Sequence, residues 1–79
     1  MPDYSIIYDA RMIEHLARNG ITIEEFTEIV RSPVRTSFSR STGRDMAFGY
    51  ALDGRYIACV YEVIDDLTIV VVTAYEIEP

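Results

Sequence analysis

The feature that most constrains the fold is the last third of the sequence, residues 54–76, in which two strand-like runs are joined by Asp65 and Asp66. Val, Ile, Tyr and Thr are frequent in both runs, and these residue types suit a pleated, half-buried surface. The runs predict two antiparallel strands, at about residues 55–63 and 67–75, because tight turns join antiparallel neighbours. The rest of the chain is expected to extend this hairpin into a sheet or to pack on it.

Two helical segments come earlier in the chain. Asp9 stands at a helix N-cap, and the apolar spacing after it predicts a helix that ends near Asn19. Thr22 and Glu25 have the spacing of a capping box, and the second helix should end just before Pro33. A Gly-containing turn makes the pair a helical hairpin. The residues expected to face the sheet are Met12, Ile13, Leu16, Ala17, Ile23, Phe26, Ile29 and Val30.

Three further strands are predicted. Residues 4–8 are a short aromatic and β-branched run, and the residues at 34–39 and 44–52 alternate between two faces. The last of these strands places Arg44, Met46, Phe48, Tyr50 and Leu52 on one face. Its other face has small residues that let a helix or another backbone approach closely, and a type I′ turn at Asp53-Gly54 should follow it. The chain is therefore expected to be a single domain spanning residues 1–79. Its fold class is α+β, with the order β-α-α-β-β-β-β and the helical hairpin packed on one face of an antiparallel sheet.

The final strand predicts a partner, because it is apolar on both of its faces. Ile69 and Val71 alternate onto one face, whereas Val70 and Val72 alternate onto the other. Such a strand is typical of the middle of a sheet that is covered on both sides. Two helices cover only one side, so we expect a partner protein or a second copy of the chain on the other side.

Charge and cysteine content restrict the classes of function. The net charge is −6, which argues against nucleic acid binding by the molecule as a whole. Residues 31–55 nevertheless carry five arginines and two aspartates, and Arg suits phosphates and carboxylates. These arginines could equally balance nearby acids on an exposed sheet face. One cysteine, Cys59, allows no intramolecular disulfide and indicates the cytoplasm.

No signal peptide is recognised, and the longest apolar run, residues 69–72, is far shorter than the ~20 residues of a membrane helix, so no membrane association is expected. The single histidine, single cysteine and scattered acids have no metal-ligand spacing, and no Gly-rich phosphate loop follows a strand. We therefore expect neither a metal nor a cofactor.

The order and spacing of several short motifs carry a resemblance. They are Asn19-Gly20-Ile21, the Thr22-x-x-Glu25 helix start, the Ser32-Pro33 stop and strands at residues 44–49, 54–57 and 70–74. Over residues 8–76 the chain resembles the BrnT-type toxins of the RelE/ParE superfamily, and equally a group of small uncharacterised domains that end in a V-V-T-A-Y strand. The toxin resemblance implies a RelE/BrnT-like fold, a type II toxin–antitoxin pair, cleavage of RNA and an antitoxin that covers the sheet. BrnT-type toxins carry a basic residue where Tyr75 stands here.

Metal-independent RNA cleavage needs a base, an acid and cations for the phosphate. Arg44 and Arg55 are the main candidates for phosphate binding, since they flank the predicted Asp53-Gly54 turn. Arg35 and Arg40 could add to this phosphate site. The candidates for proton transfer are His15, Glu62 and Tyr75, which complete a catalytic set with Arg44 and Arg55.

Each candidate also has a structural interpretation. His15 can be a partly exposed surface histidine, Tyr75 a packing aromatic, and Glu62 the partner of an Arg across the sheet. Two hypotheses follow. The chain is a toxin-like, metal-independent endoribonuclease, or it is a non-catalytic interaction module of the same fold that homodimerises through its open sheet face. The acidic balance and the absence of Lys favour the second.

Overall fold

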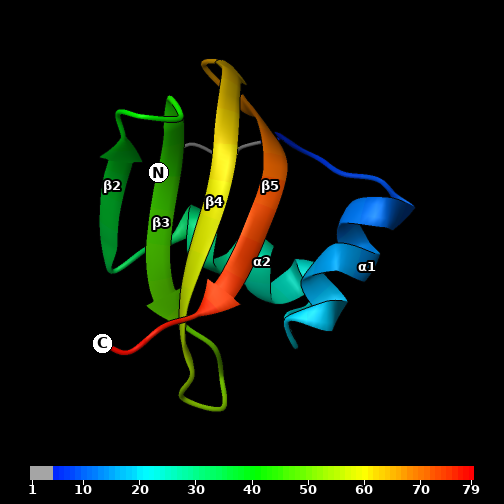
Figure 1. Cartoon of the computed structure of the whole chain (residues 1–79), viewed down its shortest axis with the longest axis vertical. Helices are drawn as coiled ribbons and strands as arrows, with labels where there is room; N and C mark the ends of the chain where they lie inside the picture. Colours follow the sequence, from blue (N-terminus) through cyan, green and yellow to red (C-terminus); the bar gives the residue numbers. More distant parts are fainter. Residues whose placement is uncertain (1–4) are drawn as a thin grey trace.

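The computed structural model describes residues 5–79. Two helices and five strands follow in the predicted order β-α-α-β-β-β-β, and the fold class is α+β (Figure 1). The strand predicted at residues 4–8 is present at its centre, and Tyr4 lies outside the described residues. The elements are β1 (Ser5–Ile7), α1 (Ala10–Arg18), α2 (Ile23–Arg31), β2 (Arg35–Ser39), β3 (Arg44–Tyr50), β4 (Tyr56–Asp65) and β5 (Thr68–Glu76).

The five strands form one mixed sheet in the order β1-β5-β4-β3-β2. The pairs between β2, β3, β4 and β5 are antiparallel, as predicted. β1 instead runs parallel to β5, with Ile6 opposite Ile69, so the prediction of a wholly antiparallel sheet is wrong. The tight-turn argument does not apply to this pair, because both helices and three strands separate β1 from β5 along the chain.

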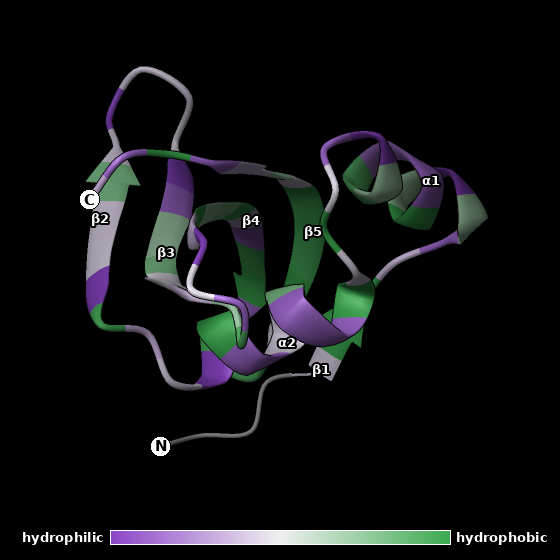
Figure 2. Ribbon diagram, turned by 90° about the horizontal axis from the view of Figure 1, so that it is seen from below, coloured by the Kyte–Doolittle hydropathy of each residue, from purple (hydrophilic) through white to green (hydrophobic). Residues whose placement is uncertain are grey.

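The two helices do not share one face of the sheet. α2 lies across one face and contacts β3 and β4, whereas α1 lies beside β5 at the edge of the sheet (Figures 1 and 2). α1 fits there because β1 pairs only with residues 68–70, which leaves the remainder of that edge of β5 to the helix. The predicted helical hairpin on one face is therefore wrong for α1. Leu16 is fully buried, but Ile13 and Ala17 of the predicted apolar stripe are exposed.

Both helices begin at the predicted caps. The carboxylate of Asp9 accepts a hydrogen bond from the backbone N–H of Met12 at 3.0 Å. In α2 the backbone N–H of Glu25 donates to the hydroxyl of Thr22 at 3.1 Å, and the Glu25 carboxylate accepts from the Thr22 N–H at 2.9 Å. This reciprocal pair is the capping box, and it satisfies backbone donors that the first turn leaves free.

The small face of β3 lets α2 approach the sheet, as predicted. A Cβ atom placed on Gly49 would lie 3.1 Å from Cγ2 of Ile29, which is closer than side chains ordinarily pack. Behind this contact lies the main hydrophobic core, between α2, Leu16 of α1 and one face of the sheet. Its buried members are Leu16, Ile21, Phe26, Ile29, Val30, Ala47, Ala51, Ile57, Cys59, Tyr61, Ile69, Val71 and Ala74.

The turn between β3 and β4 differs from the predicted type I′ turn. Ala51 donates its N–H to the Arg55 carbonyl and accepts from the N–H of Gly54. Gly54 has a φ of +92°, whereas no non-glycine residue of the described chain has a positive φ. The loop is therefore a three-residue connection with a glycine in the left-handed conformation, so Asp53 does not need the positive φ of a type I′ turn.

Candidate functional site

The face of the sheet opposite α2 is the candidate site, and we name it the open face. No helix of the described chain lies over it (Figure 2). The strand registers place on this face the side chains that alternate with those of the main core. They are Arg35, Ser37 and Ser39 of β2, Arg44, Met46, Phe48 and Tyr50 of β3, Tyr56, Ala58, Val60 and Glu62 of β4, and Val70, Thr73 and Tyr75 of β5.

Aromatic side chains gather at one end of the open face. The ring centroids of Tyr50 and Tyr56 are 4.8 Å apart, those of Phe48 and Tyr56 are 6.2 Å apart, and the guanidinium of Arg35 lies 4.5 Å from the centroid of Phe48. Ile77 packs against the same cluster, and its N–H donates to the Tyr56 carbonyl at 2.8 Å. The chain therefore shields part of the face that was expected to need an external cover.

The shielding is incomplete at the sides of this cluster. Phe48 and Tyr56 are 5% and 9% exposed, whereas Tyr50 and Tyr75 are 54% and 39% exposed. The exposed rings thus flank a buried aromatic centre. Alternation along residues 44–52 correctly placed Tyr50 on one face with Met46 and Phe48, but the sequence did not show that Tyr56 would join them.

An ion pair occupies the other end of the open face. Nε of Arg44 donates to Oε1 of Glu62 at 3.0 Å, and both side chains are well exposed. The structural interpretation of Glu62, that it pairs with an Arg across the sheet, is therefore confirmed. An exposed pair of this kind contributes little to stability, typically ~0.2–1 kcal/mol. Its main consequence is that a carboxylate neutralises the charge of Arg44.

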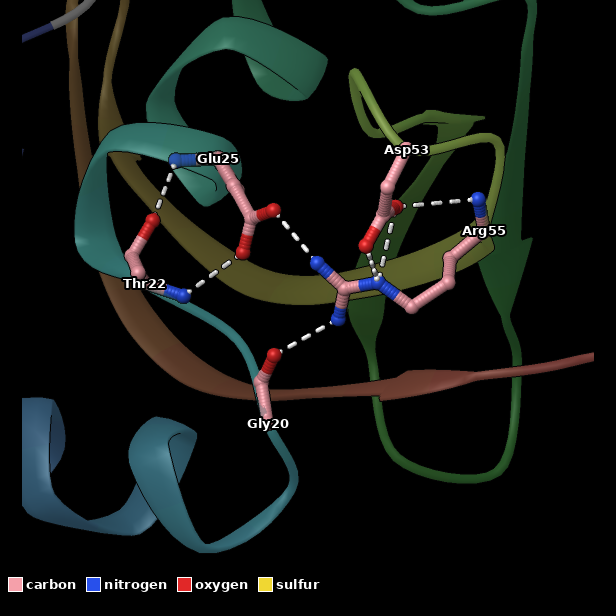
Figure 3. A network of polar contacts seen from close by, with 5 residues as sticks. All are labelled: Gly20, Thr22, Glu25, Asp53 and Arg55. Atoms are coloured by element: carbon pink, nitrogen blue, oxygen red, sulfur yellow. Dashed lines mark hydrogen bonds and ion pairs between the residues drawn. The ribbon is translucent and has the colours of Figure 1, made fainter.

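Arg55 lies away from the open face, in a network with the helices (Figure 3). Its Nε donates to both carboxylate oxygens of Asp53, at 2.9 and 2.8 Å, and its terminal nitrogens donate to the Gly20 carbonyl at 2.6 Å and to Glu25 at 2.5 Å. The Arg55 hydrogen bonds lower the pKa of Asp53, and Asp53 in turn raises the pKa of Arg55. Arg55 and Arg44 stand at opposite ends of the β3–β4 hairpin and on opposite faces, so they do not form a joint phosphate site.

His15 lies at the rim of the open face. Its Nε2 is 2.8 Å from the hydroxyl oxygen of Thr73, a β5 residue whose register partner is Val60. Glu62 is two residues beyond Val60 on β4, but the register with β5 shifts between these positions, and Val70 is the residue opposite Glu62. A hollow of about 300 Å³ adjoins this histidine. It is lined by Asp9, Arg11, Met12, His15 and Val72.

The predicted site residues are therefore only partly assembled. Arg35, Arg44, Glu62 and Tyr75 share the open face, and His15 borders it through Thr73. Arg40 is exposed in the turn between β2 and β3, and Arg55 belongs to the helix side. The sequence pattern missed Thr73 and Asn19, whose contacts depend on the unexpected position of α1 beside β5.

Comparisons with protein-family models, curated proteins and solved structures find no match to this chain. Within residues 5–79, no group of three or more His, Cys, Asp or Glu side chains is placed to hold a metal ion. None of the helices in that part of the chain has the length and apolar character to cross a membrane.

Proposed function

We propose that the chain is a protein-binding module whose open face binds a partner protein. One observation carries the proposal: exposed Tyr50 and Tyr75 flank a packed aromatic centre on a sheet face that no helix of residues 5–79 covers. Tyr, Met and Arg are enriched in protein interfaces, and Met46 and Arg35 accompany the tyrosines. Buried aromatic and Arg side chains also supply most of the binding energy at such surfaces.

The size of the face sets the kind of interface. Strands β2–β5 at their usual spacing give roughly 500 Å² of projected area. A standard stable interface buries about 800 Å² on each partner. The partner therefore has to use the whole face and its rim, and we expect a reversible complex rather than a permanent one.

Charge restricts the chemistry of the partner. The open face carries Arg35 and Arg44 against Glu62, whereas the molecule as a whole has a net charge of −6. A partner with apolar side chains and a few acids therefore suits this face better than it suits the rest of the surface. In the BrnT-type interpretation this partner is the antitoxin, and the site of binding is the cytoplasm.

Metal-independent RNA cleavage is the second candidate. It is favoured by the placement of Arg44, Glu62 and Tyr75 on one face with His15 at its rim. Three observations rank it lower. Arg55 is held on the helix side, Glu62 neutralises Arg44, and the net charge of −6 opposes attraction to RNA.

Growth after tightly controlled expression separates the two candidates. We expect no arrest from the wild type, because the proposed module has no catalytic activity. Arrest by the wild type that a His15→Ala/Arg44→Ala variant relieves would overturn the proposal in favour of the nuclease. Arg55→Ala is a poor test of catalysis, because its contacts to Glu25 and Asp53 predict a loss of stability.

Site-specific photo-crosslinking in the source cells tests the binding face directly. A benzophenone side chain at position 50 should give one discrete adduct, and the same group at Glu28, which is exposed on α2, is the matched control. Tyr75→Asp should abolish the adduct at position 50, because it introduces a charge into the contact. Equal adducts from both positions would contradict the proposal. A product of twice the chain's mass would identify a second copy as the partner.

A further inference from the structure

The two edges of the sheet differ in how the chain protects them. At one edge, the short strand β1 pairs with part of β5, and farther along α1 lies beside β5 (Figure 1). There the side-chain amide of Asn19 donates to the carbonyl of Ala74 at 2.7 Å. At the other edge, no residue within 5–79 pairs with the outer side of β2. β2 is therefore where an incoming strand meets unpaired backbone groups.

β2 lacks several of the devices that keep strands from adding to a sheet. Natural edges are often protected by lysines, prolines or bulges. β2 contains no Lys or Pro, and its register with β3 runs from Arg35 to Ser39 without a shift. Val34 and Phe38 are 62% and 56% exposed at this edge. These features are typical of a strand to which a partner strand can be added.

The charge around β2 identifies the chemistry of the incoming strand. Residues 31–44 contain four arginines and no acidic residue. Arg44 is paired with Glu62, but Arg31, Arg35 and Arg40 form no ion pair within residues 5–79. We infer that β2 binds an extended, acidic segment of another protein, which adds to the sheet as a further strand.

The two sides of β2 define the pattern of that segment. Thr36 and Phe38 point to the α2 side, whereas Arg35 and the two serines point to the open-face side. Because side chains of paired strands lie on matching sides, the segment should alternate apolar and acidic residues. A second copy of the chain would bring its own arginines to this edge, so charge favours a different protein. The inference goes beyond the proposed function, since it concerns the backbone edge and not the open face.

The probe for a test is a capped seven-residue peptide that alternates valine and glutamate. Binding is followed by amide chemical shifts of the ¹⁵N-labelled protein, and we expect the changes to concentrate in β2. A valine–lysine peptide should bind about tenfold more weakly because of the arginines. A valine–glutamate peptide with a central proline should also lose affinity, because it cannot complete the backbone ladder.

Protein variants complete the test. Arg35→Gln/Arg40→Gln should weaken binding of the glutamate peptide severalfold, whereas Arg11→Gln on α1 and Tyr50→Ser on the open face should leave it unchanged. The inference is overturned if the lysine or proline peptide binds equally well, if the shifts map outside β2, or if no shift occurs up to about 1 mM peptide. Concentration-dependent shifts in β2 without peptide would overturn it as well, since they would make a second copy the occupant.

Discussion

The guanidinium of Arg55 donates to the carboxylate of Glu25 at 2.5 Å, which joins the loop before β4 to the first turn of α2. Glu25 simultaneously accepts from the backbone N–H of Thr22 in the capping box. Arg55 also donates to the carbonyl of Gly20 in the turn between the helices. One arginine thus connects the helix turn, the start of α2 and the β3–β4 loop (Figure 3).

Replacing Arg55 by Ala should therefore lower the free energy of unfolding by about 2 kcal/mol, because several acceptors lose their donor. The Arg55 side chain is 25% exposed, so the loss should stay below that of a fully buried ion pair. Urea unfolding measures the change. Arg44→Ala is the matched control, since its ion pair is more exposed, and it should cost about 0.5 kcal/mol. Equal losses from the two variants would contradict a structural role for Arg55.

This contrast shows what sequence patterns could and could not predict about the site. Alternation placed Arg44 on a strand face correctly, because side chains of a strand alternate regardless of what packs on them. The role of Arg55 depends on the Gly20 carbonyl and the Glu25 carboxylate, which the fold brings to it from 35 and 30 positions earlier in the chain. A local pattern contains no information about such a contact.

Substituting Gly49 by Ala should destabilise the protein by about 1–2 kcal/mol, because the new methyl group would overpack the contact with Ile29. The substitution combined with Ile29→Ala should cost less than the sum of the two single changes, since the larger side chain is then absent. Thermal or urea unfolding of the wild type and the three variants checks this. Strict additivity would show that β3 and α2 do not meet at this point.

Acid should destabilise the fold partly through Asp53. Hydrogen bonds from Arg55 lower the pKa of Asp53 below its ordinary 3.8. As the pH falls, Asp53 is therefore protonated in the unfolded chain before it is protonated in the folded protein. The stabilisation that the ionised Asp53 gives the folded state above pH 4 is lost below pH 4. Unfolding midpoints between about pH 2 and pH 6 should fall less steeply for Asp53→Asn than for the wild type. Asp66→Asn removes the same charge but no contact with Arg55. If it changes the pH dependence of the unfolding midpoint as much as Asp53→Asn does, the Arg55 hydrogen bonds are not the cause.

The fold was largely predictable from the sequence, and the errors in its prediction have physical causes. Caps, breakers and alternation are local, and they predicted the seven elements and the antiparallel pairs correctly. The parallel pairing of β1 and the position of α1 depend on which edge of β5 remains free, and that is a property of the finished sheet. Ile13 and Ala17 are exposed because α1 lies at the edge of the sheet and not on its face.

Cys59 should be unreactive in the folded protein. It is fully buried in the main core, and burial raises the pKa of its thiol from 9.0 to about 12. At pH 8 only about one molecule in ten thousand would then carry the reactive thiolate. A disulfide reagent should label the native protein at least a hundredfold more slowly than the urea-unfolded protein, with Cys59→Ser as the blank. Rapid labelling of the native state would show that the strands around Cys59 open far more often than a packed core allows.

The Cys59 thiol ionises near pH 9 only in the unfolded chain. The free energy of unfolding should therefore also fall as the pH rises above 9, and Cys59→Ala should lack this decline.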